Sequence, residues 1–207
     1  APHGAVIIAL LPLATAGAAA FFAGERPGKT YWLSSIVACL TIIGYAVLSG
    51  FGALQWADLA LLGAVVSAAI GYAVGGQLSK TLGGWQVISW SLIIAFPFLV
   101  VPIAGPLLTE LQHASWTVWA GFGYISVVSM FLGFFAWYHG LALGGVARVS
   151  QTQYFQPFLS IIASWLLLSE PFTWGAVLAT VIVVLAVAKG KNASVTVKQP
   201  APSTNSR

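Results

Sequence analysis

The strongest constraint in this sequence is a series of long apolar stretches separated by short polar, glycine- and proline-containing breaks. The stretches cover residues 4–24, 30–50, 57–77, 84–106, 115–139, 147–169 and 172–188. Each is close to the roughly 20 residues that a helix needs to cross the hydrocarbon core of a bilayer. Because backbone polar groups in lipid must bond within their own segment, we expect every stretch to be a helix.

Composition agrees with a location in the membrane. Hydrophobic residues make up 59% of the 207 residues, and charged residues only 6%, whereas soluble domains carry about 25% charged residues. So few charges could not cover the surface of a soluble domain of this size. We therefore predict an all-α integral membrane protein with seven transmembrane helices. The single cysteine, Cys39, excludes an internal disulfide.

The basic residues predict the orientation of these helices. They fall in the first, third and fifth breaks and after the last stretch: Arg26, Lys29, Lys80, Arg148, Lys189, Lys191, Lys198 and Arg207. The other breaks carry acidic residues and no Lys or Arg. By the positive-inside rule the basic side is the cytoplasm, so the C-terminus is cytoplasmic and this chain begins outside. Residues 191–207 are rich in Ser, Pro, Asn and Lys and predict a disordered cytoplasmic tail.

An internal repeat relates the two ends of the apolar region. Pro12 precedes Glu25 by thirteen residues, and Pro157 precedes Glu170 by thirteen residues. Each glutamate is followed by proline and then by another apolar stretch. The charge pattern places Glu25 inside and Glu170 outside, so the two units are inverted in the membrane. Inverted repeats are typical of secondary transporters, whose sites lie near the midplane between the repeats.

The motifs around these residues resemble the EamA-type repeat of the drug/metabolite transporter superfamily. They are Glu25-Arg26-Pro27-Gly28, the run from Trp137 to Gln151, the run from Gln153 to Leu159, and Leu168-Ser169-Glu170-Pro171. The resemblance implies a ten-helix bundle of two inverted repeats in a bacterial inner (plasma) membrane. Residues 1–50 then correspond to the last two helices of the first repeat, and 51–190 to all five helices of the second.

Polar residues near Pro157 are the main candidates for contact with a cargo molecule. Gln153, Tyr154 and Gln156 precede it, and amides within membrane helices usually face protein or a watery cavity. The alternative is that they only join helices. A mid-helix proline frees a backbone carbonyl, so Pro12 and Pro157 are either cavity residues or static kinks. Weaker cavity candidates are Tyr72, Ser129 and Tyr138.

The acidic and histidine residues indicate structure more than chemistry. We expect Glu25 and Glu170, at helix ends beside prolines, to cap the helices that follow them. Whether transport is coupled to protons stays open. The three histidines have no metal-ligand spacing. The sequence has no catalytic triad order or phosphate-binding loop, and its basic residues form no patch for nucleic acid. We therefore expect no metal, no cofactor and no enzymatic activity.

These observations predict a secondary transporter that exports small organic metabolites or drugs by alternating access. The alternative is a non-transporting scaffold or a subunit of an intramembrane enzyme. The sequence does not identify the cargo or the oligomeric state.

Overall fold

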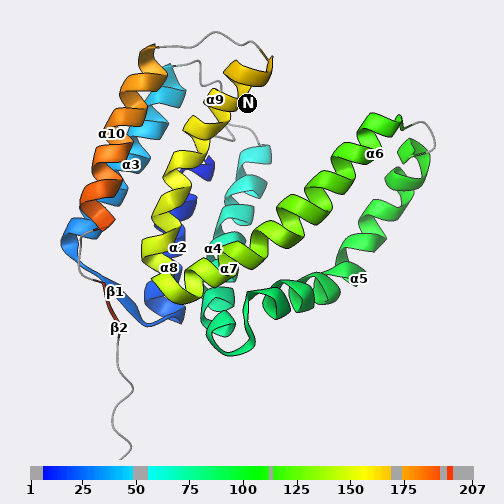
Figure 1. Ribbon diagram of the computed structural model, residues 1–207, viewed down its shortest axis with the longest axis horizontal. Helices are drawn as coiled ribbons and strands as arrows, with labels where there is room; N and C mark the ends of the chain where they lie inside the picture. The colour runs from blue at the N-terminus through cyan, green and yellow to red at the C-terminus, as the bar shows by residue number, and fades with distance from the viewer. Residues whose placement is uncertain (1–6, 49–55, 112–113, 169–173, 192–194, 198–207) are drawn as a thin grey trace, which may run out of the picture. The chain divides into compact units, whose positions relative to one another are not determined.

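The structure is a computed structural model that describes residues 7–48, 56–111, 114–168, 174–191 and 195–197. Most of these residues are helical (Figure 1). The elements in chain order are α2 (Leu11–Phe22), β1 (Glu25–Pro27), α3 (Lys29–Leu48), α4 (Trp56–Leu82), α5 (Gly84–Leu111), α6 (Trp116–Gly123), η1 (Tyr124–Leu132), α7 (Gly133–Gly144), α8 (Val146–Ser150), η2 (Gln151–Phe155), α9 (Gln156–Leu168), α10 (Trp174–Lys191) and β2 (Val195–Val197).

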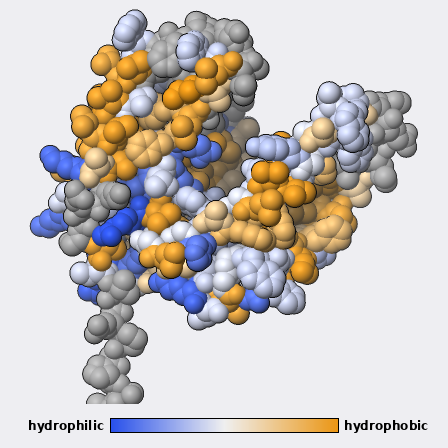
Figure 2. Space-filling model, in the orientation of Figure 1, coloured by the Kyte–Doolittle hydropathy of each residue, from blue (hydrophilic) through white to orange (hydrophobic). Residues whose placement is uncertain are grey.

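Helices lie in all seven predicted stretches, and they expose many large apolar side chains. Part of this apolar surface is visible in Figure 2. Within the described residues, three segments are long and apolar enough to cross a membrane: Trp56–Leu82, Gly84–Val101 and Trp116–Gly144. Two shorter apolar segments are Leu11–Phe22 and Val177–Gly190. The chain is thus a helical membrane protein. The prediction of a wholly disordered tail is wrong for Val195–Val197, because strand β2 pairs there with β1.

The chain divides into two compact units. Unit 1 comprises Ala1–Val74 together with Gly145–Arg207, and unit 2 is Gly75–Gly144. This division differs from the predicted repeat boundaries. It brings the first helices of the chain together with the last, and it leaves the central helices to form a unit of their own.

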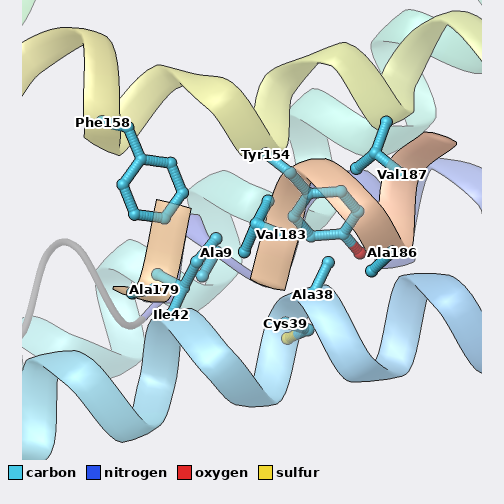
Figure 3. Packing of buried hydrophobic residues seen from close by; sticks show 10 residues of the cluster. All are labelled: Ala9, Ala38, Cys39, Ile42, Tyr154, Phe158, Ala179, Val183, Ala186 and Val187. Carbon is cyan, nitrogen blue, oxygen red and sulfur yellow. The ribbon is translucent and has the colours of Figure 1, made fainter. Parts of the chain in front are cut away.

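Unit 1 is built around the antiparallel pair α3 and α10 (Figure 1). Gly175, at the start of α10, lies against the Tyr45 ring near the end of α3, while Gly190, at the end of α10, lies against Ser34 near the start of α3. Small side chains permit this approach, since helices in membranes associate by close packing. The core between these helices and η2 contains Ala9, Ala38, Cys39, Ile42, Tyr154, Phe158, Ala179, Val183, Ala186 and Val187 (Figure 3).

Unit 2 packs glycines against one aromatic side chain. A Cβ at Gly84, the first residue of α5, would lie 2.9 Å from the Phe135 carbonyl oxygen and 3.1 Å from the His139 nitrogen. A Cβ at Gly75 would lie 2.9 Å from the Tyr138 hydroxyl. The Gly84 position therefore requires glycine for close approach to α7, whereas a Cβ at Gly75 would require the Tyr138 ring to shift. Between α6 and α7 the span contains η1, a π-helical segment.

The two strands form an antiparallel ribbon within unit 1. Glu25 pairs with Val197, Arg26 with Thr196 and Pro27 with Val195. The ribbon ties the connection between α2 and α3 to the chain that follows α10. The backbone around Glu25 is therefore held from both sides, which positions its side chain for the contacts described next.

Candidate functional site

The helical stretch that begins after Gly145 is broken into three parts. Gly145 has a φ of +82° and precedes the five-residue helix α8. A 3₁₀ segment, η2, follows it, and α9 begins at Gln156. The sequence predicted one continuous helix here. A 3₁₀ stretch within a helix often marks a functional hinge, and secondary transporters often build their sites on interrupted helices.

Pro157 explains the 3₁₀ geometry. Proline has no N–H with which to bond the carbonyl four residues earlier, which belongs to Gln153. That carbonyl instead accepts a hydrogen bond from the Gln156 N–H, three residues away. Pro157 is thus the second residue of α9, and the prediction that it lies mid-helix is wrong. Pro12 likewise lies in the first turn of α2, where proline fits without the loss of a helix hydrogen bond.

Glu25 joins the two ends of the chain. Its side chain is 1% exposed. The Val146 N–H donates to its Oε1 at 2.7 Å and the Ala147 N–H to its Oε2 at 2.8 Å. The positive φ of Gly145 turns the chain at this point, where a Cβ would lie 3.3 Å from Glu25 Oε1. The glutamate therefore stabilises the start of α8, whereas the sequence assigned it to the helix that follows it.

A network of buried hydroxyl and amide groups continues from this contact. The Tyr31 hydroxyl donates to the Ala147 carbonyl at 2.6 Å, and the Ser150 hydroxyl donates to the same carbonyl at 2.8 Å. Gln151 Nε2 donates to the Ser35 hydroxyl at 3.0 Å. These bonds link α3 to α8 and η2, segments that are more than 100 residues apart in the sequence.

Gly190 makes room for this network. A Cβ at this position would lie 2.7 Å from Gln151 Nε2 and would also meet the Ser34 hydroxyl. The end of α10 can therefore approach only because the residue there has no side chain. Three elements, α3, η2 and α10, enclose the Gln151 amide, which is 2% exposed.

Three buried polar atoms on η2 have no hydrogen-bond partner within the described residues. They are Gln151 Oε1, Gln153 Oε1 and the Tyr154 hydroxyl. The Gln153 side chain lies near the Tyr72 hydroxyl, and the Tyr154 hydroxyl lies near the Ser35 hydroxyl. Tyr154 is 1% exposed and lies in a cluster with Ala38 and Ala186, small apolar side chains (Figure 3). The buried side of η2 thus offers two acceptors and one hydroxyl that the surrounding helices do not satisfy.

The structure brings together some of the predicted site residues and separates others. Gln153, Tyr154 and Tyr72 lie in unit 1 around η2, and Gln156 is exposed at the start of α9. Two candidates belong to unit 2: Tyr138 packs against Gly75, and Ser129 is exposed on η1. Glu170 falls outside the described residues, as do His3 and His113.

Sequence reasoning missed the α3 side of the site. Tyr31 and Ser35 are four residues apart and so share one face of α3, and both are buried. Two polar side chains on one face of an apolar helix are a signal that could have identified them. Nothing in the sequence shows that this face meets η2, because the contact joins segments at opposite ends of the chain.

Comparison with known proteins identifies the family. The sequence model of the EamA-like transporter family matches residues 55–188. The chain is also 37% identical over 194 residues to a Bacillus subtilis (strain 168) protein described as "Uncharacterized transporter YdeK". The match covers 91% of this chain and 66% of that protein, so the chain spans just under two thirds of its relative's length. No solved structure gives a match. The chain belongs to the EamA-like transporter family.

Proposed function

We propose that this chain forms most of a secondary transporter that exports small organic metabolites or drugs by alternating access. The proposal includes seven transmembrane helices within a ten-helix inverted-repeat bundle, with residues 1–50 and 51–190 in successive repeats and the C-terminus in the cytoplasm. Membership of a transporter family supports the general function. The unsatisfied polar atoms of η2 support the location of the cargo site.

The main support for a cargo site at η2 is the energetic cost of burying these polar atoms without hydrogen bonds. A buried polar group without a partner costs about 1–3 kcal/mol, and native proteins contain few such groups. The segment Gln151–Phe155 has three such atoms when only the described residues are considered. Packing alone does not favour this concentration on five residues. A segment that meets a polar cargo in another conformation of the transport cycle would regain these hydrogen bonds.

The chemistry of η2 suggests what the cargo carries. Amide oxygens accept hydrogen bonds, while the tyrosine hydroxyl both donates and accepts. Gln151 and Gln153 are uncharged. A cargo that combines N–H or O–H donors with an acceptor, and an apolar part to fit among the alanines around Tyr154, would suit this surface.

Transport assays on everted membrane vesicles test the proposal. Vesicles from cells that express the protein would be offered a panel of labelled amino acids, nucleobases, sugars and cationic dyes. We expect uptake of at least one class above vesicles without the protein. Gln153→Leu should lower that flux roughly fivefold to tenfold, the effect of about one hydrogen bond. Tyr124→Phe is the matched control, because Tyr124 is 64% exposed on η1.

Two results would contradict the proposal. One is the absence of flux for every compound in the panel while the protein is folded and inserted. The other is flux that Gln153→Leu and Tyr154→Phe leave unchanged, which would move the cargo site away from η2 even if transport itself is real.

A further inference from the structure

Four exposed basic side chains, which we call the basic rim, lie on the segments that meet at one end of unit 1. The rim consists of Arg26 on β1, Lys29 at the start of α3, Arg148 on α8 and Lys189 near the end of α10. Hydrophilic side chains gather at the end of unit 1 where β1 and β2 lie (Figure 2). In the sequence these residues are spread over the whole chain, so only the fold assembles them.

Specific contacts hold the four segments together. Glu25, beside Arg26, accepts hydrogen bonds from Val146 and Ala147, beside Arg148. The Tyr31 hydroxyl, two residues after Lys29, also donates to the Ala147 carbonyl. These bonds are buried and short, so they fix the backbone that carries Arg26, Lys29 and Arg148.

The fourth segment joins through α10 and the ribbon. Gly190, next to Lys189, lies against Ser34 and Gln151. After α10 the chain forms β2, in which Thr196 pairs with Arg26. Lys189 is therefore held at the same end of the α3–α10 pair as Lys29.

The segments that carry the rim have a net positive charge, because Glu25 is their one acidic residue among those that the structure describes. Glu25 is buried, and both its oxygens receive backbone N–H groups. The other described acidic residue of unit 1, Asp58, lies in the first turn of α4, on none of the segments that carry the rim. Lys29 is the first residue of α3, where the positive end of the helix dipole disfavours a cation and favours an anion.

The position of the rim at the end of the apolar helix surface indicates which kind of anion it binds. Beyond Lys29 the outer side of α3 is apolar, with Leu33, Ile36 and Leu40 exposed, and α10 exposes Ile182 and Leu185 before Lys189. The rim therefore lies where a lipid-facing surface ends, at the level of the headgroups. Long basic side chains at helix ends extend toward this interface.

We propose that the basic rim binds the phosphate of anionic phospholipid headgroups, such as phosphatidylglycerol, and holds this end of unit 1 at the membrane surface. Clustered Lys and Arg side chains beside membrane helices attract anionic lipid. The four cations come from β1, α3, α8 and α10, so one headgroup layer would bridge segments from both ends of the chain. This binding does not depend on the identity of any cargo.

Lipid titration of the purified protein tests this binding. The protein in nonionic detergent would be titrated with phosphatidylglycerol or phosphatidylcholine, and retained lipid would be counted by native mass spectrometry. We expect phosphatidylglycerol to bind at least tenfold more tightly. Arg26→Gln and Lys29→Gln should each weaken that binding roughly fivefold, as expected for loss of one charge near an anionic surface, and 0.5 M salt should weaken it in the parent protein.

Lys80→Gln is the matched control. Lys80 is exposed in the last turn of α4 and lies on none of the segments that carry the rim, so its loss should weaken the binding less than the loss of a rim residue. Equal affinity for the two lipids would overturn the proposal, and so would equal weakening by Lys80→Gln. Full displacement of phosphatidylglycerol by millimolar inorganic phosphate would also overturn it, because the rim would then be a site for free phosphate. Far-ultraviolet circular dichroism of each variant separates lost binding from lost folding.

Discussion

The two units of this protein are stabilised in different ways. Unit 1 buries a carboxylate, several hydroxyls and an amide, which bond across more than 100 residues of sequence. Unit 2, as far as the structure describes it, relies on glycines that let α4 and α5 approach α7 around Tyr138. Helices in lipid gain little from hydrophobic burial. Buried hydrogen bonds and close packing at glycines are therefore both expected to hold them together. In unit 1 the buried bonding leaves polar atoms on η2 that a cargo could use.

The largest effect should come from removing the Glu25 side chain. Glu25→Ala leaves the Val146 and Ala147 N–H groups buried and without acceptors. We expect unit 1 to lose about 3 kcal/mol of unfolding free energy, measured by SDS titration in mixed micelles. Glu25→Gln keeps one acceptor oxygen and should lose less. A loss below about 1 kcal/mol for the alanine variant would show that the contact contributes little.

A steric clash at Gly84 should destabilise unit 2. Gly84→Ala places a Cβ 2.9 Å from a backbone oxygen of α7, which cannot move aside as a side chain could. We expect a loss of about 2 kcal/mol, typical of overpacking, in the same titration. Gly71→Ala is the control, since no atom lies within 4 Å of its added Cβ. Equal stability of the two variants would contradict the close packing of α5 on α7.

The ribbon offers a smaller test of how unit 1 joins its two ends. Thr196→Pro removes a backbone donor and should disrupt the pairing of β2 with β1. Two-stranded ribbons are marginally stable alone, so we expect a loss of about 1 kcal/mol or less. Hydrogen exchange at the Arg26 amide should become faster while exchange in α5 stays the same. Unchanged exchange at Arg26 would mean that the C-terminal strand does not protect β1.

The contrast between unit 1 and unit 2 also shows which features the sequence could predict and which it could not. Helices were predictable because a membrane-spanning segment must satisfy its own backbone, whatever its neighbours are. The partner of Glu25 was not predictable, because the glutamate and Val146 are 121 residues apart and the intervening helices are apolar on all sides. Such helices have no periodicity that indicates which face is buried.

The positions of the prolines within their helices were also difficult to predict from the sequence. The repeat predicts that Pro12 and Pro157 lie in equivalent units, which stays a prediction, and the length of the apolar stretches suggested that both lie mid-helix. In the structure both occupy first turns, because each helical stretch breaks just before its proline. The break at η2 depends on a backbone bond between Gln156 and Gln153 that residue types alone do not specify. The polar residues of this region stay candidates for a cargo site, and their burial against α3 was not predicted.

Tyr154→Phe should have the smallest effect on stability and a clear effect on transport. The Tyr154 hydroxyl lies near the Ser35 hydroxyl but makes no hydrogen bond of good geometry among the described residues, so Tyr154→Phe removes a buried group that contributes little to the fold. We expect the unfolding free energy to change by less than about 0.5 kcal/mol or to rise. If η2 binds cargo, transport should nevertheless fall, because residues kept for function are often unfavourable for stability. The same variant measured by SDS titration and by vesicle flux therefore distinguishes the two roles. A large loss of stability with unchanged flux would mean that the hydroxyl supports the core of unit 1 and that the cargo site lies elsewhere.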